Sequence, residues 1–152
     1  MTIDAVNSSA SGGFPAVIPL AALLGFQLER MDAGQAVVSC GHRKDLCNSY
    51  GFIHGGTLMA LMDIALVHAA RAPDEPAGPI RAPCVTVDMS TSFIGPASGR
   101  LHANARVVGR TASLSFCEAV VTGPGGEICA RGIGTLRHIQ PAATAPQPPE
   151  LS

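Results

Sequence analysis

The residues best suited to chemistry lie in one stretch between Asn48 and Asp63. Within it, His54 precedes the glycine pair Gly55-Gly56, and the run TLMALMDIALVHAA that follows contains a single acid, Asp63. Free backbone N–H groups at a helix start favour negative charge, because the positive end of the helix dipole lies there. A carboxylate within an apolar helix is costly unless it is paired or used. An oxyanion donor and a buried acid on one element therefore indicate acyl chemistry.

The element that must position these groups is a long helix, predicted from about Gly55 to Arg71. Because the run is apolar on all sides, we predict that this helix is central and buried. Partial alternation and turn residues predict strands around it, at residues 26–31, 36–42, 84–94, 101–108, 114–122 and 127–139. A short helix at 19–25 precedes them. Two strands, a helix and four strands predict an α+β fold, an antiparallel sheet wrapped round one long central helix.

The composition limits the classes of protein to consider. The chain has 152 residues, which suits one domain, and only 14% of them are charged, so we expect part of the surface to be buried against another copy. A net charge of −1 gives no indication of nucleic-acid or membrane binding. The five cysteines have no metal-type spacing, and without a secretory signal they indicate reduced thiols in a cytoplasmic protein.

Composition also divides the chain. We predict a flexible N-terminal arm at residues 1–15, a folded domain at 16–139 and a disordered Pro/Ala-rich tail at 140–152.

Four signatures together suggest a family. They are Asn48-x-x-Gly51-x-x-His54-Gly55-Gly56, then Asp63, then Val85-Thr86-Val87-Asp88-Met89, then Phe93-Ile-Gly-Pro96. In this combination the chain resembles, over about residues 20–138, the hotdog-fold acyl-CoA thioesterases of the PaaI-like, phenylacetate-degradation type. The resemblance implies hydrolysis of acyl-CoA thioesters, with no metal and no cofactor beyond the CoA of the substrate. It also implies a homodimer with shared active sites, which we expect to pair into a tetramer.

The resemblance further implies roles for individual residues. Asn48 and the backbone N–H of Gly55 would polarise the thioester carbonyl, and Asp63 would activate water or attack directly. Thr86 would help to hold the water, while His54 would order the loop. Gly56, Arg110 and Ser113 are weaker predictions for CoA contacts.

Helix geometry separates two of these groups. Asp63 lies eight residues after Gly55, which is roughly 12 Å at about 1.5 Å per residue. Reacting groups must approach to about 3–3.5 Å. We therefore predict a composite site, with Asn48 and Gly55 from one subunit and Asp63 and Thr86 from its neighbour.

Two alternatives remain open at this stage. One is an enoyl-CoA hydratase or dehydratase on the same fold, and the other is a non-catalytic acyl-CoA-binding module. The set of Asn48, His54-Gly55-Gly56 and Asp63 favours the hydrolase over both. The sequence leaves the acyl group undetermined.

Overall fold

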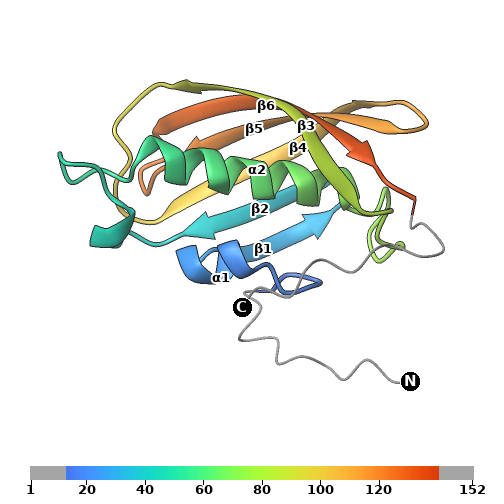
Figure 1. Cartoon of the computed structure of the whole chain (residues 1–152), viewed down its shortest axis with the longest axis horizontal. Coiled ribbons are helices and arrows are strands. Elements are labelled where there is room, and N and C mark those ends of the chain that lie inside the picture. The colour runs from blue at the N-terminus through green and yellow to red at the C-terminus, as the bar shows by residue number, and fades with distance from the viewer. Residues whose placement is uncertain (1–12, 141–152) are drawn as a thin grey trace, which may run out of the picture.

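The computed structural model describes residues 13–140, which form a curved antiparallel sheet with a long helix lying along its concave face (Figure 1). In chain order the elements are α1 (Pro19–Leu24), β1 (Gln27–Asp32), β2 (Gln35–Cys40), the short 3₁₀ turn η1 (Lys44–Leu46), α2 (Gly55–Arg71), β3 (Cys84–Phe93), β4 (Leu101–Arg110), β5 (Leu114–Thr122) and β6 (Ile128–His138). The strand order across the sheet is β1-β2-β4-β5-β6-β3, and all neighbours are antiparallel. The predicted element order and α+β class are confirmed.

Most predicted boundaries are close to those observed, and the limits of α2 match the prediction. One strand was predicted too long: the segment expected at 36–42 ends at Cys40 as β2, so His42 lies in the connection that follows. That connection runs through η1 to the start of α2 and contains Asn48, Gly51 and His54 of the first signature.

The helix α2 packs closely against β6 because two glycines there have no side chain. A Cβ added at Gly134 would lie 2.9 Å from Cδ1 of Leu66, and one added at Gly132 would lie 3.3 Å from Sδ of Met62. Both Met62 and Leu66 are fully buried. Well-packed cores respond to a single added methyl group, so these glycines fix the depth at which α2 sits.

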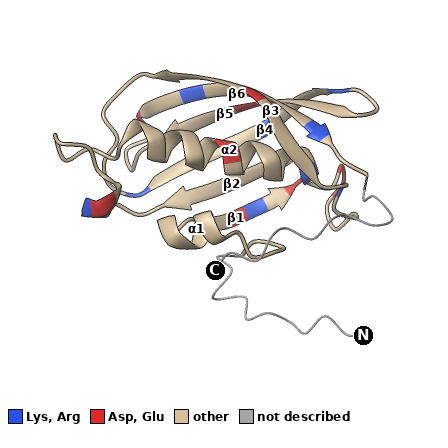
Figure 2. Ribbon diagram, viewed as in Figure 1, with Lys and Arg blue, Asp and Glu red and all other residues tan. Residues whose placement is uncertain are grey.

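The prediction that α2 is buried on all sides was wrong for the single chain. Gly56 and Met59 are exposed, and Asp63 and Val67 are half-buried. With spacings of three and four residues these positions form one stripe along the helix. The acid therefore lies on the open side of α2 rather than in the core. Figure 2 shows acidic colour in the middle of α2, whose only acid is Asp63.

The edge strand β3 differs from a regular alternating strand. Its pairing with β6 shifts register between Thr86 and Asp88. Val85 and Val87 are 48% and 61% exposed, whereas Thr86 contacts α2. The sequence alternation would have assigned Val85 and Val87 to the core face, and the shift explains why they do not lie there. Since β3 ends the sheet order, one side of its backbone has no neighbouring strand in the described chain.

The predicted arm and tail fall almost wholly outside the described residues. Of the predicted arm, Phe14 is described, and it is buried with its ring edge against His68 at a centroid distance of 4.9 Å. Within residues 13–140, no helix is both long and apolar enough to cross a bilayer.

Candidate active site

The loop before α2 is ordered by Asn48. Its side-chain oxygen accepts hydrogen bonds from the backbone N–H groups of Tyr50 (2.9 Å) and Phe52 (3.2 Å). Its own N–H donates to the carbonyl of Phe52 at 2.7 Å. Asx residues commonly organise tight turns in this way. Because the oxygen is engaged, the NH₂ group of the same amide remains as a donor, and it has no partner among residues 13–140.

The start of α2 leaves one backbone donor available. His54 caps the helix, and its Nδ1 accepts from the N–H of Gly56 at 2.8 Å. The N–H of Gly55 has no acceptor in the described part of the chain. The first N–H groups of a helix have no partner within the helix itself, and here His54 accepts from those of Gly56, Thr57 and Leu58 but leaves that of Gly55 free. The His54 side chain therefore bonds to the start of α2, and the Gly56 amide, predicted to contact CoA, is already bonded to it.

A small hollow lies next to these two donors. Its volume is about 180 Å³, and it is lined by Asn48, Gly55, Phe93 and parts of the loops around them. The Phe93 ring covers Gly55 so closely that a Cβ on this glycine would lie 3.2 Å from Cε1 of the ring. The structure therefore adds Phe93 to the candidate site. Its place in a predicted signature was the only sequence signal for it.

Asp63 and Thr86 form a second group of site residues. Thr86 Oγ1 donates to Asp63 Oδ1 at 2.6 Å, joining α2 to the edge strand β3. Within residues 13–140 no ion pair involves Asp63. A hydroxyl bonded to one carboxylate oxygen fixes the orientation of that group. Asp63 is half-buried beside an open strand edge, so its second oxygen can face an incoming group.

The chain keeps these two groups apart. Gly55 and Asp63 are separated by eight positions of one regular helix, or roughly 12 Å along its axis. Asn48 and Gly55 meet at the N-terminal end of α2, while Asp63 and Thr86 meet near its middle. A single chain therefore places Asn48 beside Gly55 and Asp63 beside Thr86, but it does not bring these two pairs together.

Arg110 and Ser113 do not join either group. Arg110 points inward, where Nη1 donates to the carbonyl of Ala70 (2.8 Å) and to Oγ of Ser115 (2.9 Å). Burial lowers the pKa of its guanidinium. Ser113 is exposed in the turn between β4 and β5. Their CoA contacts stay predictions, and in this conformation Arg110 is committed to holding the end of α2.

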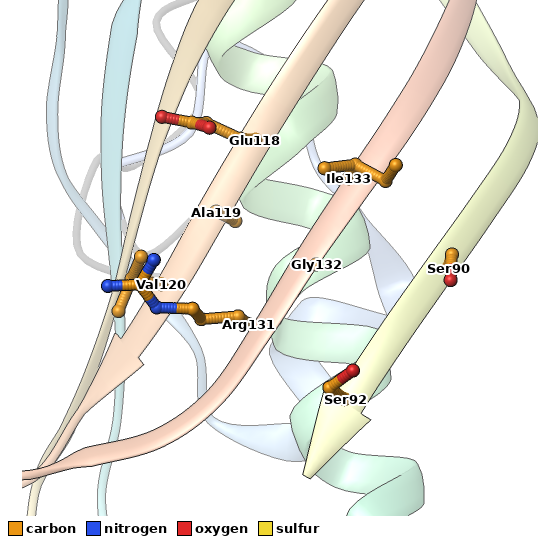
Figure 3. A pocket seen from close by; sticks show the side chains of 8 residues that line it. All are labelled: Ser90, Ser92, Glu118, Ala119, Val120, Arg131, Gly132 and Ile133. Atoms are coloured by element: carbon orange, nitrogen blue, oxygen red, sulfur yellow. The ribbon is translucent and has the colours of Figure 1, made fainter. Parts of the chain in front are cut away.

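A larger hollow on the other face of the sheet contains none of the predicted residues. It has a volume of about 280 Å³ and is lined by Ser90, Ser92, Glu118, Ala119, Val120, Arg131, Gly132 and Ile133. Figure 3 shows α2 behind the strands that form it. This hollow is larger than the hollow beside Asn48 and Gly55, but no paired acid and amide donors line it. The chemistry therefore favours the two groups on α2.

Comparisons with known proteins agree with this fold. The family model of the thioesterase superfamily matches residues 50–130, more than half of the chain. Among solved structures, AziG from S. sahachiroi is 32% identical, with 82% of this chain and 99% of that chain covered and a TM-score of 0.71. A mutant of the phenylacetic acid degradation protein PaaI from Thermus thermophilus is 26% identical, with 80% and 100% covered and a TM-score of 0.71.

The PaaI protein from the E. coli phenylacetic acid degradation operon has the same fold, with a TM-score of 0.73 at 22% identity over 81% of this chain and 86% of that chain. A comparison with curated proteins finds no match. The chain belongs to the thioesterase superfamily. Its fold is the hotdog fold of PaaI-like thioesterases, as the resemblance predicted, and its enzyme class is thioester hydrolase.

Proposed function

We propose that the protein hydrolyses acyl-CoA thioesters to a free acid and CoA at a site shared by two subunits. The main support is the separation of the site's parts along α2. The two free donors, on Asn48 and Gly55, adjoin one hollow, whereas the acid lies farther along the helix beside an open strand edge. A second copy that supplies Asp63 to the hollow of the first would complete both sites of a two-fold dimer.

The proposed reaction uses each group once. The N–H of Gly55 and the NH₂ of Asn48 donate to the thioester oxygen, and donors of this kind contribute about 2.7–4 kcal/mol each to an acyl-transfer transition state. Asp63 of the other subunit takes a proton from water as the water oxygen bonds to the carbonyl carbon. The C–S bond breaks, and the proton passes to the departing thiolate. Thr86 holds the carboxylate in place.

In an alternative mechanism, Asp63 attacks the carbonyl carbon itself instead of activating water. The Asp63 oxygen would then bond to the acyl carbon as the C–S bond breaks and the CoA thiolate departs, and water would open the resulting anhydride. A single turnover in ¹⁸O-labelled water distinguishes the two routes. Label in the Asp63 carboxylate indicates direct attack followed by opening of the anhydride at the Asp63 carbon, whereas general base catalysis places label in the product acid alone.

We propose β3 as the strand on which the second copy docks. An uncovered strand edge is a template for pairing with another chain. β3 is such an edge and also contains Thr86. Its exposed Val85 and Val87, together with Phe116 and Ile133, add apolar surface on the outer face of the sheet. We assign this outer face to contact between two dimers. Light scattering gives the assembly state, and a monomer at working concentration would contradict both contacts.

Release of free CoA thiol from a panel of acyl-CoAs tests the activity. The panel spans short, medium and aromatic acyl groups, with Asp63→Ala as the control. We expect release from at least one member and none above background with the variant. Binding without release would favour the acyl-CoA-binding module. Loss of enoyl absorbance without thiol release would favour the hydratase.

Mixing two inactive variants tests the shared site. Asp63→Ala and Asn48→Ala chains are unfolded together, refolded and compared with each variant refolded alone. One of the two sites in a mixed dimer then has all its groups, so we expect partial recovery of activity. Mass spectrometry of the intact assembly verifies that mixed dimers form. Mixed dimers with no recovery would mean that each chain builds its own site.

A further inference from the structure

His42 and Cys47 form a pair in the connection between β2 and α2. The Cys47 sulfur is 3.2 Å from Nε2 of His42, and its S–H lies 3.1 Å from the carbonyl of Arg43, to which it donates. The N–H of Gly99 donates to Nδ1 of His42 at 3.0 Å. Since Nδ1 is the acceptor, the neutral ring has its proton on Nε2, where it points at the sulfur.

This arrangement suits a reacting thiol. The thiolate is the nucleophilic form of cysteine, and a neighbouring donor or positive charge stabilises it. The Nε2–H of His42 is such a donor, and Gly99 fixes the orientation of the ring. Cys47 is only partly buried, so a small reagent can reach it from solvent.

The other four cysteines lack this combination. Cys40, Cys117 and Cys129 are buried. Cys84 is partly buried, with its sulfur directed at the carbonyl of Val67 at 3.8 Å. Burial raises the pKa of Cys40 and Cys84 to about 11 and that of Cys117 to about 12. These thiols are protonated at neutral pH, and none of them has a ring nitrogen as partner.

We propose that Cys47 is a site of reversible modification by low-molecular-weight disulfides of the glutathione type. The Cys47 thiolate attacks one sulfur of the disulfide, so a new S–S bond forms as the old one breaks. The departing thiolate takes up the proton that Cys47 released. Cys47 is thereby oxidised to a mixed disulfide while the other half of the reagent is reduced to a thiol, and no further oxidant is needed.

The adduct would act on the neighbouring site. Cys47 precedes Asn48 and pairs with Ile53 in a bridge that closes the loop between them. A glutathione group on Cys47 occupies the surface beside Asn48, which lines the hollow. We infer that the adduct stops thioester hydrolysis. This second step rests on the proposed function, whereas the modification itself does not.

Treatment of the folded protein with glutathione disulfide at neutral pH tests the modification. Peptide mapping by mass spectrometry follows each cysteine with time, and protein unfolded in guanidinium gives the intrinsic reactivity of each thiol. We expect folded Cys47 to react at least about tenfold faster than Cys84. His42→Ala should remove most of this advantage, and Cys84→Ser should leave it unchanged. Reaction of Cys47 no faster than Cys84 in the wild-type protein would overturn the proposal, even if His42→Ala failed to fold.

Activity is measured on the same samples. We expect thiol release from acyl-CoA to fall in step with the Cys47 adduct, to return with a reducing agent, and to be insensitive to the disulfide in Cys47→Ser. Full activity of the modified protein would overturn the inference that the adduct stops hydrolysis. If unmodified protein releases no thiol from any acyl-CoA, the proposed function fails, but the peptide map still decides whether Cys47 is the modified residue.

Discussion

The two halves of the candidate site differ in how completely one chain builds them. At the start of α2, Asn48 and His54 are fixed by hydrogen bonds within their own loop. In the middle of α2, Asp63 has one described hydrogen-bond partner, Thr86, on a strand with an open edge. The donor half is therefore preorganised by local contacts, as oxyanion donors must be. The surroundings of Asp63 in the acid half depend instead on whatever packs against the open edge of β3.

The largest expected effect is at the acid. Asp63→Asn keeps the shape of the side chain and removes its charge, so hydrolysis should fall about 10²–10⁴-fold, the usual range for a general base. The melting temperature should stay the same or rise, because a carboxylate on an apolar helix is costly. Thiol-release kinetics measure the rate of hydrolysis, and thermal melts measure the melting temperature. An active variant would show that the acid half is structural.

Asn48→Asp tests the donor half. The new carboxylate can still accept from the N–H groups of Tyr50 and Phe52, but it has no NH₂ group to offer the substrate. We expect kcat to fall about 10²–10³-fold with little loss of stability. Asn48→Ala is the matched control, since it removes both functions and should also lower the melting temperature. Equal melting losses in the two variants would mean that the loop, rather than the donor, accounts for the effect.

Gly55→Ala tests the close contact between the Phe93 ring and Gly55, whose backbone N–H is free within residues 13–140. The added Cβ would lie 3.2 Å from the Phe93 ring, so the ring or the helix start must shift. We expect kcat to fall about tenfold, because small displacements of positioned groups reduce rates. Replacement of Phe93 by Leu in the same chain should restore part of the loss. If the double variant is no faster than Gly55→Ala, the ring does not determine the position of this amide.

The smallest expected effect is at Thr86. Thr86→Val keeps the branched shape but removes the 2.6 Å hydrogen bond to Asp63, and we expect kcat/KM to fall about threefold to tenfold. Thr86→Ser retains the hydroxyl and should be close to the wild-type protein. The same loss in both variants would point to packing of the threonine methyl group instead.

Local signals were enough to predict the helix. The glycine pair and the apolar run predicted the limits of α2, and His54, just before the pair, caps the helix. Alternation failed at β3, where the register shift turns Thr86 rather than its valine neighbours towards Asp63. Such an irregularity depends on the pairing with β6, which the local pattern of one strand does not contain.

Long-range contacts account for the other differences. Arg110 was predicted as a CoA contact, which stays a prediction, and its side chain also bonds to the carbonyl of Ala70 on α2, far away in sequence. His42 was expected within the strand at 36–42, but it lies beyond β2, where its ring accepts from the N–H of Gly99, far away in sequence. No periodicity or motif near these residues encodes such pairings.

The missing side chains of Gly132 and Gly134 have an effect beyond tight packing. Met62 and Leu66, which fill the space they leave, stand on either side of Asp63 in the sequence. The height of the helix above β6 thus sets how far the acid projects past the rim of the sheet. A methyl group at position 134, which lies outside both halves of the candidate site, would shift the carboxylate and slow the reaction that we propose between two subunits.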